Sequence, residues 1–101
     1  NIDNEQLKSG IQIDNLNDFI KNISNLKNIV IRGLMAIPSK TNILKDKVDS
    51  YTILRLAFEK LNTEMKNFDT LSIGMSNDFK IALQHGSNML RIGQHIFGKR
   101  N

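Results

Sequence analysis

The chain has 101 residues, 40% hydrophobic and 24% charged, which is the composition of one small globular domain without room for two independent cores. The absence of cysteine excludes disulfides and thiolate metal sites and fits a reducing cytoplasm. No apolar run approaches the roughly 20 residues that span a bilayer, and the net charge of +4 includes no basic run, which argues against membrane and nucleic-acid partners.

The first half of the chain alternates between helical and strand-like patterns. Residues 14–26 carry apolar side chains at helical spacing, with Asp14 as a candidate N-cap. Residues 28–38, "NIVIRGLMAIP", form an apolar run closed by Pro38 and predict a strand buried on both faces. Helical spacing returns over residues 45–67.

The second half continues the alternation. Residues 70–75, "TLSIGM", predict a second strand, after which Ser76 can cap a short helix that Gly86 ends in the left-handed conformation. Residues 88–93, "NMLRIG", predict a third strand, followed by a short turn or helix that ends near Gly98. This order of elements predicts βαβ units and a parallel sheet.

The number of strands indicates an incomplete barrel. A sheet that is apolar on both faces needs cover on both sides, and the chain supplies only one layer of helices. A closed barrel covers its own inner face, so we predict an α/β fold that is the C-terminal portion of a (β/α)₈ barrel. A first residue of Asn1 and not methionine fits a piece of a longer protein.

The candidate binding residues lie at the carboxyl ends of the predicted strands, where parallel α/β proteins place their functional groups. These ends fall at residues 35–38, 74–77 and 91–95. Backbone amides, the Ser76 hydroxyl and the close backbone approach that Gly93 permits suit a phosphate dianion. The alternative is that Gly74 and Gly93 only make turns and that Ser76 is an ordinary helix cap.

Arg91 needs a partner, because a buried guanidinium without one is costly. That partner is a phosphate, a ring nitrogen of a cofactor, or a carboxylate such as Asp69 or Asp78. Arg32 has the same ambiguity, with a structural ion pair favoured. The two histidines lack a third ligand at metal spacing, so no metal site is predicted.

Four segments carry a family resemblance. They are "KSGI" (residues 8–11), "RGLMAIP" (32–38), "LSIGMSNDF" (71–79) and "GSNMLRIGQHIFGKR" (86–100). In this order they resemble the C-terminal part of the YggS/PROSC family of pyridoxal phosphate (PLP) homeostasis proteins, over nearly all of the chain. Members are single barrels similar to the N-terminal domain of alanine racemases. The resemblance implies that residues 1–101 are a single partial domain, from the end of barrel strand 5 through strand 8, with the N-terminal half of the barrel missing.

The resemblance also implies roles for the candidate residues. Ser76 would hold the cofactor phosphate, and the backbone amides of Gly93 and Gln94 would complete the phosphate cradle. Arg91 would face the pyridine nitrogen, which must then stay unprotonated because a guanidinium only donates. The family usually has threonine or serine at the position of Gln94. Its covalent lysine lies on the first barrel strand, which is absent here, and Lys8 is only a weak substitute.

We therefore expect a non-catalytic, cytoplasmic carrier or regulator of PLP, with no catalytic residue, PLP-dependent apoenzymes as partners and a monomeric full-length state. Two alternatives stay open. One is a racemase-like barrel enzyme with the same cofactor, for which the sequence offers no obvious acid or base because Tyr51 falls in the middle of a helix. The other is a truncated relative that no longer binds PLP.

Overall fold

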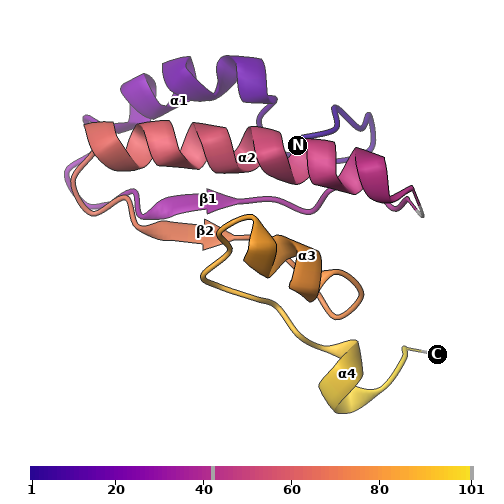
Figure 1. Ribbon diagram of the computed structural model, residues 1–101. Helices are drawn as coiled ribbons and strands as arrows, with labels where there is room; N and C mark the ends of the chain where they lie inside the picture. Colours follow the sequence, from indigo (N-terminus) through magenta and orange to yellow (C-terminus); the bar gives the residue numbers. More distant parts are fainter. Residues whose placement is uncertain (42, 101) are drawn as a thin grey trace.

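The computed structural model describes residues 1–41 and 43–100, and Figure 1 shows two helices lying above two short parallel strands. A 3₁₀ turn (Ile13–Asn15) leads into the first helix. The further elements, in chain order, are α1 (Leu16–Ile23), β1 (Gly33–Met35), α2 (Leu44–Glu64), β2 (Thr70–Ser72), α3 (Phe79–Gln84) and α4 (Gln94–Phe97).

The helices follow the predicted pattern, with corrections at their starts. Helix α2 confirms the prediction for residues 45–67 closely. Helix α1 is shorter than predicted, and Asp14 is not its N-cap, because Asp14 lies in the 3₁₀ turn and Asn15 holds that position. The C-terminal helix ends at Gly98 as predicted, with a φ of +83°.

The strands are much shorter than predicted. β1 and β2 pair in parallel over three residues each, in the register Gly33 with Thr70 and Met35 with Ser72. One more hydrogen bond, from Ala36 N–H to Ser72 O at 3.2 Å, extends the pairing beyond them. Ile29 lies before β1 with an exposed side chain and no strand partner among the described residues, so the apolar run does not continue as a ladder.

The third predicted strand is present as an extended segment beside β2, joined to the sheet mainly by side chains. A single parallel bridge pairs Met75 with Arg91. Elsewhere Asn88 Oδ1 accepts from Leu71 N–H at 2.8 Å, and Ser87 Oγ donates to the Ile73 carbonyl. Two backbone bonds also join the segments, from Asn88 N–H to Leu71 O at 3.1 Å and from Arg91 N–H to Gly74 O at 3.0 Å, but side-chain bonds lie between them and no regular ladder forms.

The core lies between the helices and one face of the sheet. It contains Tyr51 and Leu54 of α2 and, from the sheet, Leu71 and Ile73. The prediction that residues 28–38 are buried on both faces is wrong in this structure. Met35, on the opposite face, is 64% exposed, because no described element covers that side.

Two polar contacts tie distant segments to this core. Asp3 Oδ1 accepts from Ser50 Oγ and Asp3 Oδ2 from Ser39 N–H, both at 2.6 Å, which joins the N-terminal segment to α2. Arg32 forms a bidentate ion pair with Asp69 at 2.7 Å, which confirms the favoured structural interpretation of Arg32. Within the described ranges, no helix is both long and apolar enough to cross a membrane.

Replacing Gly74 by alanine should destabilise the fold by about 2–4 kcal/mol. Gly74 has a φ of +103°, and a Cβ there would lie 2.6 Å from Ala82 Cβ and 2.9 Å from a Leu90 methyl carbon. Gly86→Ala is the matched control, because Gly86 has a φ of +89° but open space around a Cβ. It should cost only about 1 kcal/mol in chemical denaturation. Equal losses in the two variants would contradict the predicted clash.

Stability should fall in acid partly through Asp3. Burial alone would raise the pKa of Asp3, but the hydrogen bonds from Ser50 and Ser39 outweigh it and hold the pKa below its ordinary value of 3.8. A carboxyl with a lowered folded-state pKa stabilises the fold above its unfolded pKa, and this contribution is lost as the pH falls through the folded value. Melting temperatures between about pH 6 and pH 2 should therefore fall less steeply for Asp3→Asn than for the wild type. Parallel curves would contradict the prediction.

Candidate functional site

A cleft of about 930 Å³ opens at the carboxyl ends of β1, β2 and the extended segment beside them. Its walls come from the loop after β1, one face of α2, the turn before α3 and the start of α4. All four predicted cofactor-binding residues line it: Ser76, Arg91, Gly93 and Gln94. Their convergence follows from the parallel arrangement, which brings successive strand ends to one edge.

The Ser76 hydroxyl lies where two backbone amides converge. Ser76 Oγ accepts from Gly93 N–H and from His95 N–H, each at 3.3 Å. These bonds are longer than the usual 2.9–3.0 Å, so both amides are weakly engaged and remain suited to a stronger, anionic acceptor. Ser76 is not the helix cap that the sequence suggested, since Asp78 holds that position before α3.

Gly93 has no packing reason to be glycine. Its φ is −121°, which other residues adopt, and a Cβ there would meet no atom within 4 Å. Gly74, in contrast, is required by its positive φ and its crowded surroundings. The alternative that both glycines only make turns is therefore supported for Gly74. At Gly93, which lines the cleft and begins α4, neither the φ angle nor packing requires glycine.

Gln94 offers a backbone N–H at the start of α4. No hydrogen bond joins the Gln94 N–H to another described residue, and Gln94 is the first residue of α4. Together with the two amides at Ser76, this gives three backbone donors within three consecutive residues. The sequence interpretation missed the His95 N–H, because every residue except proline has a backbone N–H and the residue type does not show which one faces the cleft.

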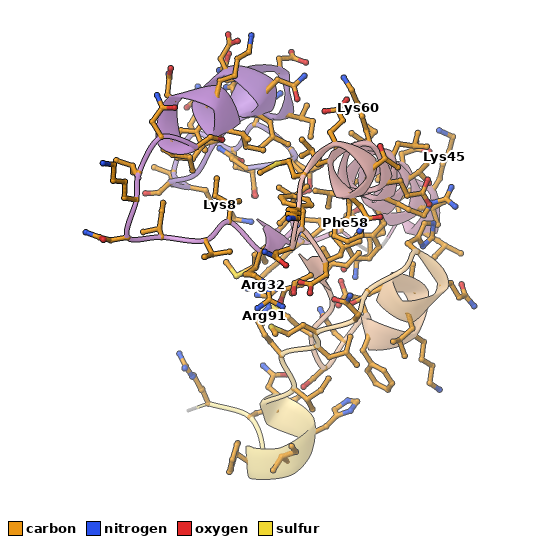
Figure 2. The ribbon with its side chains drawn as sticks, turned by 90° about the vertical axis from the view of Figure 1, so that its left-hand side faces the viewer. Lys8, Arg32, Lys45, Phe58, Lys60 and Arg91 are labelled. Atoms are coloured by element: carbon orange, nitrogen blue, oxygen red, sulfur yellow. The ribbon has the colours of Figure 1, made fainter. Side chains whose placement is uncertain are left out.

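Arg91 spans the strand ends and is held by neutral oxygens. Its Nε donates to Ser72 Oγ at 3.2 Å, and its Nη2 donates to the carbonyls of Ala36 at 3.0 Å and Ser72 at 3.3 Å. An ion pair with Asp69 or Asp78, one of the three partners that the sequence left open, is absent among the described residues. Nη1 makes no hydrogen bond to any described residue, so the guanidinium keeps donors for an acceptor in the cleft. Figure 2 shows Arg91 between α2 and α4.

Tyr51 and Asp78 also belong to the site, although the sequence interpretation placed Tyr51 outside it. Tyr51 is fully buried, lines the cleft and donates its hydroxyl hydrogen to Asp78 Oδ2. Burial first, and then the Asp78 carboxylate, raise the pKa of Tyr51, so the phenol stays a donor. One sequence feature could have pointed to Asp78: like Ser76, it is a residue type that caps helices, and it lies in the turn before α3.

The cleft carries an excess of positive charge. Four cations line it, and Asp78 is the one carboxylate among its described lining residues. The cations are Lys40, Lys47, Arg91 and Arg100. Because Asp78 already accepts from Tyr51 and, at 2.8 Å, from Met75 N–H, its charge is compensated locally. An anionic ligand is therefore favoured.

The histidines are engaged in packing. His95 lies edge-on to the Phe79 ring at 5.8 Å, and His85 packs on Tyr51 with its Nδ1 2.8 Å from the Ile81 carbonyl. Within residues 1–41 and 43–100, no group of three metal-ligating side chains is found.

The comparisons with known proteins show the family of this chain. The chain matches the family "alanine racemase, N-terminal domain" over residues 1–101, and it belongs to that family. Relatives named "pyridoxal phosphate homeostasis protein" are 44% identical in Pasteurella multocida, 42% in Haemophilus influenzae and 40% in Escherichia coli. These matches cover the whole chain and 44%, 44% and 43% of the respective relatives, so the chain spans less than half their length.

A solved structure shares the fold. The crystal structure of an unknown protein from Bifidobacterium adolescentis superposes on 94% of this chain and 39% of its own, with a TM-score of 0.86 at 25% identity. The comparisons thus support the predicted family resemblance and an α/β fold. They do not confirm the predicted placement of the chain in the C-terminal half of a (β/α)₈ barrel, and the barrel itself stays a prediction.

Arg91→Lys should loosen the strand ends. A lysine keeps the charge but lacks the planar fork that contacts Ser72 and Ala36 together, so we expect a loss of about 1–3 kcal/mol in unfolding free energy. Arg32→Lys is the control, because its ion pair with Asp69 is exposed and screened by solvent and should contribute little to stability. Urea denaturation measures both. A larger loss for Arg32→Lys would contradict the assignment.

Proposed function

We propose that this chain binds pyridoxal 5′-phosphate in the cleft at its strand ends, as part of a protein of PLP homeostasis. The observation that carries the proposal is the convergence of the Gly93 and His95 amides on Ser76 beside Arg91. The names of the relatives support the same ligand class.

The phosphate end of the ligand fits the amide-rich side of the cleft. A dianion would compete with the Ser76 hydroxyl for the two weakly engaged amides, and the Gln94 N–H adds a third donor. Such charge-assisted bonds are roughly twice as strong as neutral ones. The bare backbone at Gly93 leaves room for close approach.

The ring end of the ligand fits Arg91. Bound PLP supplies an aldehyde and a pyridine ring, which draws electrons strongly only when its nitrogen is protonated. The unengaged Nη1 of Arg91 can donate to that nitrogen but cannot accept from it. Arg91 would therefore keep the ring nitrogen of a bound PLP unprotonated, which would favour holding the cofactor over using it for catalysis.

A non-catalytic role also fits the acid–base groups of the cleft. A racemase-like enzyme needs a proton donor and acceptor at the substrate. Tyr51 lines the cleft, but its proton is committed to Asp78 and its raised pKa opposes ionisation. We therefore propose a carrier or regulator that works in the cytoplasm, is monomeric at full length and supplies PLP-dependent apoenzymes.

Gly93→Ala should abolish tight PLP binding while leaving the fold intact. A Cβ at this position would meet no protein atom within 4 Å, and Gly93 lines the cleft. The added methyl group should therefore keep the ligand from the backbone amides, and we expect affinity to fall at least tenfold. Dissociation constants would be measured for the protein by fluorescence titration with PLP and with unphosphorylated pyridoxal. Melting temperature reports the fold.

The control for this experiment is Gly86→Ala, which lies outside the cleft and should leave PLP binding unchanged. Wild-type protein should prefer PLP to pyridoxal by a large factor. A wild type that binds neither compound, or a Gly93→Ala variant that binds PLP normally, would contradict the proposed function.

A further inference from the structure

One face of α2 forms a wall of the cleft. Lys47 and Tyr51 are four residues apart on this helix, so they lie on the same face one turn apart, and both line the cleft. The phosphate cradle itself comes from loops after the strands. The face of α2 adds to the cleft separately from these loops. Tyr51 supplies a hydrogen bond, and Lys47 supplies a positive charge.

Tyr51 holds the turn that carries Ser76. Its hydroxyl donates to Asp78 Oδ2, while Asp78 Oδ1 accepts from Met75 N–H at 2.8 Å. The Asp78 N–H in turn donates to the Met75 carbonyl at 3.1 Å. Residues 75–78 are thus closed by a backbone and a side-chain bond, and Tyr51 anchors this closed turn to the buried face of α2. The position of Ser76 therefore depends on α2.

Lys47 supplies positive charge to the cleft, whereas Lys45, two residues earlier on α2, does not. Lys45 pairs with Asp49 at 2.9 Å, and its side chain is 82% exposed. Figure 2 shows Lys45 at the edge of the molecule, far from Arg91 in that view. Lys47 is half-buried, lines the cleft and has no carboxylate within ion-pair distance among the described residues.

We propose that this face of α2 is the third wall of the phosphate site, with Lys47 as an anion-binding residue and Tyr51 as a positioning residue. Lys47 adds positive charge to the same cleft that Gly93 and Gln94 line. Tyr51, through Asp78, fixes the turn that presents the Ser76 hydroxyl. The inference rests on the proposed function for the identity of the ligand, but the anion site can be tested without PLP.

The experiment compares Lys47→Gln, Tyr51→Phe and Lys45→Gln with the wild-type protein. Each is titrated with PLP, with pyridoxal and with inorganic phosphate, at two salt concentrations. Lys47→Gln should lower the affinity for PLP and for inorganic phosphate about three- to fivefold and leave the affinity for pyridoxal unchanged. It should also make PLP binding less dependent on salt concentration. Lys45→Gln should match the wild type in every titration.

Tyr51→Phe should lower the affinity for PLP about three- to tenfold, because the turn of residues 75–78 loses its hydrogen bond to α2. A purely structural role would weaken PLP and pyridoxal equally, whereas a role in the phosphate turn changes the ratio of the two affinities. Asp78→Asn should produce the same change in ratio, since it weakens the same anchor.

The outcomes separate the two proposals. If the wild type binds PLP but Lys47→Gln behaves like Lys45→Gln, the proposal that α2 forms a wall of the phosphate site (the α2 wall) is wrong, and the proposed function stands. If wild type binds inorganic phosphate with the predicted Lys47 dependence but does not prefer PLP, the α2 wall stands and the proposed function is wrong. Equal loss of PLP and pyridoxal in Tyr51→Phe would overturn the positioning role.

Discussion

The arrangement of the site depends on how Arg91 is held. Its guanidinium reaches from the extended segment beside β2 to the Ser72 hydroxyl and to the carbonyl of Ala36, which directly follows β1. Neutral oxygens fix its position without cancelling its charge. A carboxylate in their place would have produced an internal ion pair with nothing left for a ligand. The same contacts draw together the three chain segments whose ends form the cleft.

These Arg91 contacts matter because the sheet is short. With three-residue strands and a third segment joined through Asn88 and Ser87, the backbone ladder contributes little to the alignment of the strand ends. Side chains perform that task instead. The same residues thus maintain the architecture and shape the binding surface.

Much of this could be predicted from the sequence, and the failures have physical reasons. Helix α2 follows from its apolar period, and the placement of Ser76 and Gly93 around one cleft follows from their positions at strand ends. The strand lengths could not be predicted, because an apolar run does not reveal whether a neighbour is present to pair with it. Tyr51 was missed for a related reason: its helical period predicts burial but does not show that its hydroxyl reaches Asp78.

The two glycines of the cleft differ in what constrains them. Position 74 is determined by the fold, since any side chain there collides with Ala82 and Leu90. Position 93 is free of such pressure from the protein itself. Were the proposed PLP site lost in a descendant, the fold would still require glycine at position 74 but would tolerate substitutions at position 93. A comparison of the two positions across relatives would then separate lineages in which the open cleft is under selection from those that kept only the scaffold.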